Sequence, residues 1–165
     1  MAANDKKDLL KQNRILVVDD EPDVLEHLRE VLSNFCVDTA SSFEVTSELL
    51  ENNQYDVAVL DIMGVRGYDL LNKCVRKKIP AIMLTSKAVS QEDLLRSLRE
   101  GAVLFLSKEY MNSLETYISE LIQAKREQKS PFKRWMDTLD DFFKKLLGVD
   151  YRKEHRDIFD KLLSQ

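Results

Sequence analysis

The chain has 165 residues, enough for one well-buried domain of about 120 residues and a short appendage. Its 25 basic and 29 acidic side chains leave a formal charge of −4, so the surface offers no general attraction for a polyanion and disfavours nucleic-acid binding. The N-terminus has no signal-peptide core, and no apolar run approaches the length of a membrane span. We therefore expect a protein of the cytoplasm that does not bind membranes.

Short apolar runs alternate with helical patterns from residue 14 onward. Each run is four or five residues long, as expected for a strand buried between helices. The segments between the runs repeat apolar residues at helical spacing, and Pro22, Ser90 and Gly101 mark helix ends. Five strand–helix alternations predict a parallel sheet with right-handed crossovers. The expected strands are 15–18, 36–40, 57–60, 81–84 and 103–106, and the expected helices are 22–33, 43–52, 68–75, 91–100 and 109–125.

The two cysteines are isolated in the sequence. Cys36 falls in an expected strand and Cys74 on an expected helix face, and neither belongs to a Cys-x-x-Cys pair. We expect both to be reduced thiols with structural roles, Cys36 within a buried strand and Cys74 on the packed face of its helix.

Carboxylates follow the first and third apolar runs. Asp19 and Asp20 come directly after Val18, and Asp61 follows Leu60. Open parallel sheets bind ligands at the carboxyl ends of their strands, so we expect these acids at one edge. Three carboxylates repel one another unless a cation joins them, and oxygen ligands with residual water suit Mg²⁺. The pattern therefore predicts a magnesium site.

A hydroxyl and an amine follow the last two runs. Thr85 comes directly after Leu84, and Lys108 comes two residues after Leu106. A carboxylate pair, a single Asp, a hydroxyl and a Lys at successive strand ends resemble the receiver domain of two-component response regulators over residues 14–126. The resemblance implies an α/β fold with a doubly wound, five-stranded parallel sheet of flavodoxin-like order 2-1-3-4-5.

The resemblance also implies a role for each residue of the motif. The chain would take a phosphoryl group from a sensor histidine kinase or a phosphotransfer protein and signal to an unknown target by protein contact. It would be a phosphoacceptor switch rather than a turnover enzyme. The implied residues are the phosphoacceptor Asp61; the Mg²⁺ ligands Asp19, Asp20, Asp61 and the backbone carbonyl of Met63; and the phosphoryl-binding and switch residues Thr85, Lys108 and Phe105.

The chain departs from the family pattern next to this expected site. The loop over residues 61–68 is shorter than usual and has no Pro, which leaves the lifetime of a phosphoryl group open. Glu109 stands where the family tends to carry a cis Pro, and because a non-proline cis bond costs about 2.5 to 4 kcal/mol, we predict a trans Lys108–Glu109 peptide. We also expect Glu109 to compete for Lys108 as an ion-pair partner, and Lys87 to be solvated surface.

The residues after Lys129 predict an amphipathic helical hairpin. Ser130 and Pro131 suit the start of a helix whose apolar stripe runs to Leu147. A second helix follows Gly148, with Asp150 as its expected cap. We therefore divide the chain into an N-terminal extension (1–13), a receiver domain (14–129) and a C-terminal helical extension (130–165).

A two-helix hairpin cannot bury both of its apolar stripes alone. Three surfaces could bury these stripes, and we weight them equally: the receiver's own surface, a second copy of the chain in a homodimer, or another protein.

Two other functions fit parts of the pattern. A degenerate pseudo-receiver that acts as a dimerisation or scaffold module would explain the short loop and Glu109. A magnesium-dependent phosphohydrolase of the haloacid dehalogenase type ranks third, because its motif needs Asp-x-Asp whereas Asp19-Asp20-Glu21 supplies Asp-x-Glu. The chain also has no room for a substrate cap.

Overall fold

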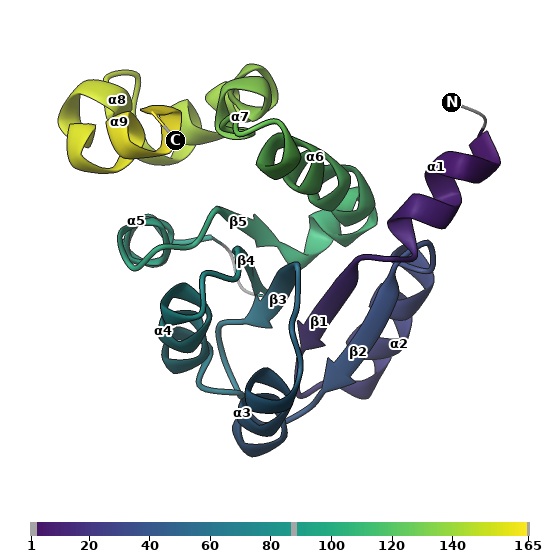
Figure 1. Cartoon of the computed structure of the whole chain (residues 1–165). Helices are drawn as coiled ribbons and strands as arrows, with labels where there is room; N and C mark the ends of the chain where they lie inside the picture. Colours follow the sequence, from purple (N-terminus) through teal and green to yellow (C-terminus); the bar gives the residue numbers. More distant parts are fainter. Residues whose placement is uncertain (1–2, 87–88, 165) are drawn as a thin grey trace.

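The computed structural model describes residues 3–86 and 89–164. It has a five-stranded parallel sheet that lies between helices (Figure 1). The strand order is β2-β1-β3-β4-β5, which confirms the predicted doubly wound topology. The strands are β1 (Arg14–Val18), β2 (Cys36–Ala40), β3 (Val57–Asp61), β4 (Ala81–Thr85) and β5 (Leu104–Ser107).

Helices cover both faces of the sheet, with α2 and α6 on one face and α3, α4 and α5 on the other (Figure 1). The additional helix α1 precedes β1, and the 3-10 helix η1 joins β5 to α6. The helices of this part are α1 (Ala3–Leu10), α2 (Pro22–Val31), α3 (Phe43–Asn52), α4 (Gly67–Arg76), α5 (Gln91–Arg99), η1 (Lys108–Ser113) and α6 (Leu114–Arg126).

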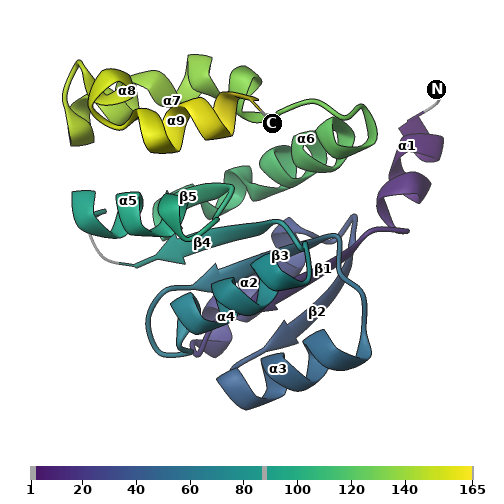
Figure 2. The same ribbon diagram turned by 60° about the vertical axis from the view of Figure 1, so that its left-hand side comes forward.

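Burial along the strands follows from this layering. Every residue of the central strands β3 and β4 is buried, because helices exclude water from both of their faces. Every residue of the edge strand β5 is also buried, and this edge lies beneath the C-terminal helices (Figure 2). The other edge strand, β2, pairs only with β1 and lies at the side of the sheet away from the C-terminal helices (Figure 2), and its first residue, Cys36, is exposed. The prediction of a buried Cys36 is therefore wrong, whereas the predicted burial of Cys74 in α4 is confirmed.

Local capping explains several helix ends. The Ser90 hydroxyl accepts a hydrogen bond from the Asp93 amide at 3.0 Å, which confirms the predicted start of α5. The helix expected from residue 109 begins instead as η1 and becomes α-helical at Leu114. The Lys108–Glu109 peptide is trans, as predicted, since the described residues contain no cis bond.

The C-terminal helices α7 (Phe132–Leu147), α8 (Tyr151–Glu154) and α9 (Arg156–Ser164) form a layer over α5, β5 and α6 (Figure 2). The second predicted helix is divided at His155, whose backbone leaves the helical region. Asp150 occupies the N-cap position of α8, as predicted, but its side chain makes no capping hydrogen bond. Of the three coverings considered for the apolar stripes, the receiver's own surface is the one in the structure, since α9 contacts α5 and Trp135 of α7 contacts α6.

Candidate functional site

Four neighbouring strand ends bring the predicted site residues to one edge of the sheet. Val18 of β1 pairs in register with Leu60 of β3, so Asp19 and Asp61 each lie one residue beyond a matched pair. Thr85 ends β4 and is buried, and Lys108 directly follows β5. The carboxyl ends of parallel strands therefore assemble the acids, the hydroxyl and the amine, as the sequence predicts.

The Lys108 ammonium lies among three carboxylates. Its Nζ is 2.7 Å from Asp19 Oδ2, 3.3 Å from Glu21 Oε1 and 3.5 Å from Asp61 Oδ1. Asp19 and Asp61 are only 1% and 4% exposed, so the amine neutralises charge that water does not reach. Glu21, rather than the predicted Glu109, is the third carboxylate partner of Lys108.

Burial controls the ionisation of this cluster. Burial of the Asp61 carboxyl, reinforced by the charge of Asp19, raises its pKa to about 6, although Lys108 opposes the shift. Burial alone would lower the pKa of Lys108, but its bond to Asp19 and its attraction to Asp61 outweigh that effect, and the pKa is raised. Asp61 is thus a buried carboxylate that ionises near neutral pH, and Lys108 carries a positive charge beside it.

Three carboxylates at this edge could hold a hard cation. Oxygens of Asp19, Asp20 and Glu21 lie within 4.8 Å of one another, and such a set suits Mg²⁺. The negative charge of Asp20 also raises the pKa of Asp61, so these two carboxylates lie close together. Met63 lies in the loop after Asp61 with its side chain about half exposed, and its carbonyl as a ligand stays a prediction.

The short loop after β3 packs directly against the acids. Gly64 has a backbone φ of +84°, and a Cβ at this position would overlap the Asp20 carboxylate. A Cβ at Gly67 would likewise overlap the Asp61 backbone carbonyl. These two glycines allow the loop to lie against the acids. In the sequence, the only sign of this close approach was the presence of two glycines in the loop.

Two further predicted residues, Phe105 and Thr85, lie in the strands β5 and β4. Phe105 is 2% exposed and pairs with Met83 within the sheet, so it belongs to the core, and its switch role stays a prediction. Thr85 pairs in register with Ser107, next to Lys108. Lys87 lies outside the described residues.

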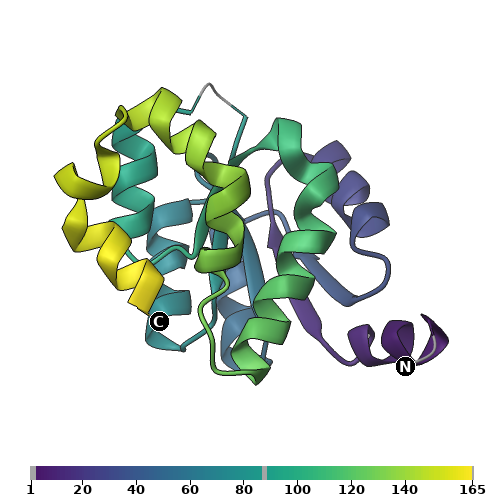
Figure 3. The same ribbon diagram turned by 90° about the horizontal axis from the view of Figure 1, so that it is seen from above.

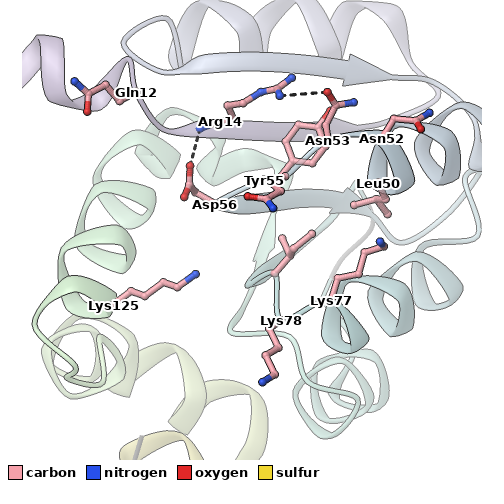
Figure 4. Close-up of a pocket in the computed structure, with 12 residues that line it drawn as sticks. Gln12, Arg14, Leu50, Asn52, Asn53, Tyr55, Asp56, Lys77, Lys78 and Lys125 are labelled. Atoms are coloured by element: carbon pink, nitrogen blue, oxygen red, sulfur yellow. Dashed lines mark hydrogen bonds between the residues drawn. The ribbon is translucent and has the colours of Figure 1, made fainter.

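A hollow of about 820 Å³ lies at the amino ends of the strands, at the opposite end of the sheet from the acids (Figure 4). Arg14 on its wall is bound to Asp38 at 2.7 Å. Lys77 and Lys78 follow the last turn of α4, and Lys125 lies in the last turn of α6. Amines at helix C-termini offset the partial negative charge there. These charges thus have a structural explanation, and the acidic edge remains the candidate functional site.

The fold is a doubly wound domain. Its site of acids and an amine lies at the carboxyl ends of β1 and β3, where the strand order reverses. The sequence of the chain matches the family model of the response regulator receiver domain over residues 15–119, which is well over half of the chain. The chain belongs to the response regulator receiver family.

Relatives of known sequence and structure agree with this assignment. The heme response regulator HssR of Staphylococcus aureus is 36% identical over 101 residues, which are 58% of this chain and 44% of that protein. The chain therefore spans less than half of the curated relatives it matches.

Two crystal structures of receiver domains align over most of the same region. A CheY-like receiver from Methanospirillum hungatei is 27% identical, with a TM-score of 0.64, covering 70% of this chain and 98% of that one. One from Clostridium thermocellum is 29% identical, with a TM-score of 0.61 and the same coverage. Within residues 3–86 and 89–164, every helix is too short or too polar to cross a bilayer.

Proposed function

We infer that this receiver accepts a phosphoryl group on Asp61 from a phosphohistidine of a sensor kinase or phosphotransfer protein. The observation that carries this inference is the Lys108 amine, 2.7 Å from Asp19 and 3.5 Å from Asp61 at the carboxyl edge of the sheet. Lys108 carries a positive charge beside two buried carboxylates. It can therefore bind the negative charge that a phosphoryl group would add to the site. Receiver domains are signalling switches, and we propose the same role here.

The transfer needs a nucleophile and positioned charge. A carboxylate oxygen of Asp61 attacks phosphorus, the phosphorus–nitrogen bond to the donor imidazole breaks, and the imidazole leaves with the electron pair and takes a proton from water. Asp61 is mostly ionised at pH 7, since its pKa is about 6. Lys108 then moves from Asp19 and Glu21 to a phosphoryl oxygen, while the Thr85 hydroxyl donates to another.

Asp19, Asp20 and Asp61, with the Met63 carbonyl, would hold Mg²⁺ in this proposal. The bound ion supplies positive charge that offsets the repulsion between the carboxylates and the incoming phosphoryl group. Lys108 and Mg²⁺ would therefore share the neutralisation of the site.

Intact mass measurement tests the proposal. Acetyl phosphate with Mg²⁺ should add one phosphoryl group to the wild-type chain and none to Asp61→Asn. Asp56→Asn is a matched control, because Asp56 precedes the same strand at the opposite edge, where it accepts a hydrogen bond from the Arg14 amide. This control should gain the same mass as wild type. A mass gain in Asp61→Asn would exclude Asp61 as acceptor, and no gain in wild type would favour a pseudo-receiver.

Asp20→Ala should weaken Mg²⁺ binding by roughly tenfold or more, since changes around metal ligands commonly cost one to two orders of magnitude in affinity. Isothermal titration calorimetry measures the effect. Asp23→Ala is the control, because Asp23 is an exposed acid three residues away in the first turn of α2. Equal losses in the two variants would show a general charge effect and contradict a direct role of Asp20.

A further inference from the structure

The C-terminal helices share one buried core with the receiver. Buried residues of α7 and α9 belong to the same apolar cluster as the strands, and α7 runs beside α6, as the light green and green helices of Figure 3 show. The Trp135 indole donates a hydrogen bond to Glu120 at 2.6 Å. The rings of Trp135 and Tyr117 meet edge to face, with their centroids 5.4 Å apart. These contacts hold α7 against α6, so a cavity between them has fixed walls.

A cavity of about 310 Å³ lies where α7 faces β5, η1 and α6. Its apolar floor consists of Leu106 of β5 with Leu139 and Phe142 of α7. Leu106 and Leu139 are 4% and 6% exposed, whereas Tyr110, which also lines the cavity, is 52% exposed. The cavity therefore has a buried apolar floor and an open side through which a small molecule can enter.

Hydroxyl groups supply the polar part of the lining. The side chains that carry them are those of Ser107, Tyr110, Ser113, Tyr117 and Thr138. The Ser107 hydroxyl accepts a hydrogen bond from the Glu109 amide at 3.3 Å, and its own hydrogen can still be donated to a ligand. Burial raises the pKa of Tyr117, and nearby Glu120 and Tyr110 add to the shift, so this phenol stays protonated at neutral pH and can also donate. The cavity thus offers hydrogen bonds to an oxygen or nitrogen atom of a ligand.

Among the described residues, those that line this cavity carry no charge. The cavity of about 290 Å³ between α5 and α9 differs, because Arg99, Asp157 and Lys161 line it. A charged ligand would lose hydration under α7 without gaining a partner of opposite charge, which is costly. The cavity under α7 therefore favours neutral ligands.

The volume of the cavity limits the size of a ligand. An apolar cavity of about 150 Å³ in a protein core binds benzene, and the cavity under α7 has about twice that volume. It therefore suits a molecule of about two fused rings. Tyr117 and Phe142 offer aromatic surfaces against which such a flat molecule can stack or pack edge to face.

We propose that the cavity under α7 is a binding site for a neutral two-ring aromatic compound that carries a hydrogen-bond acceptor. The rings of the ligand lie on the apolar floor, and its acceptor atom takes hydrogen bonds from the hydroxyls of Ser107 and Tyr117. Ser107 directly precedes Lys108, so the ligand lies beside the segment that carries the amine of the acidic edge. Binding needs neither Mg²⁺ nor a phosphoryl group and does not depend on the proposed phosphoacceptor function.

Isothermal titration calorimetry of the full chain with 2-naphthol at neutral pH tests the site. Wild type should bind one molecule per chain. Thr138→Trp should bind at least about tenfold more weakly, because an indole at this exposed lining position fills the opening of the cavity. Asp141→Trp is the matched control, since Asp141 is exposed on the same helix outside the lining, and should bind like wild type. No binding by wild type, or equal affinities of the two Trp variants, would overturn the proposal.

Tyr117→Phe removes one proposed donor and keeps the ring that packs against Trp135. It should weaken binding of 2-naphthol by roughly fivefold, the usual contribution of one hydrogen bond. Tyr151→Phe is its control, because Tyr151 is buried in α8 outside the lining and its hydroxyl donates to Asp140. Equal affinities of the two Phe variants would contradict the role of Tyr117 as a donor.

A charged analogue tests the class of ligand. Naphthalene-2-sulfonate has the same rings and a negative charge, and it should bind at least about tenfold more weakly than 2-naphthol. Equal binding of the two compounds by wild type would overturn the assignment of a neutral ligand.

Discussion

Asp61→Asn should stabilise the metal-free protein by up to about 3 kcal/mol at pH 8, where the wild-type carboxylate is ionised. The pKa of Asp61 is raised from 3.8 to about 6, first by burial and then by the neighbouring charge of Asp19. The neutral carboxyl therefore contributes stability that is fully present below about pH 4 and lost as the pH rises through 6. An amide at this position has no charge to bury and keeps the stability at pH 8.

Urea unfolding in the presence of a chelator at pH 4 and pH 8 measures this effect. The stability difference between Asp61→Asn and wild type should be near zero at pH 4 and reach its full value at pH 8. Asp69→Asn is the control, because Asp69 is exposed in an i,i+3 pair with Arg66 and should show little dependence on pH. A wild-type protein as stable at pH 8 as Asp61→Asn would mean that Lys108 already compensates the buried charge in full.

The strands of the sheet were predictable because the pattern that marks each one, a short run of apolar residues, is contained within the strand itself. Four of the five strands are continuous apolar runs buried on both faces, and periodicity alone finds them. The exposure of Cys36 was not predictable in this way, since it depends on β2 being the edge strand that the C-terminal helices do not cover. Strand order came from the resemblance of the site motif rather than from periodicity.

The sequence predicted which residue types gather at the site but not how they pair. Glu21 contacts Lys108 across 87 positions of the chain, and only the folded sheet brings them together. The contact of Gly64 with Asp20 is equally non-local. The position of α7 and α9 on the receiver also needed tertiary structure, because an amphipathic stripe specifies that it must be covered and not what covers it.

Gly64→Ala should weaken Mg²⁺ binding by roughly tenfold, since a Cβ would push Asp20 away from its neighbours and displaced ligands bind metal poorly. It should also destabilise the fold by about 1 to 3 kcal/mol, because the backbone φ of +84° is strained for any residue with a Cβ. Calorimetric titration with Mg²⁺ and urea unfolding measure the two effects separately.

Gly148→Ala separates backbone strain from the contact with Asp20. Gly148 also has a positive φ, +96°, but a Cβ there would meet no atom within 4 Å. Both variants should lose stability through strain, whereas only Gly64→Ala should lose affinity for Mg²⁺. If Gly64→Ala binds Mg²⁺ as tightly as Gly148→Ala does, then Asp20 can move away from the loop without cost, and the contact with Gly64 does not position Asp20 for Mg²⁺.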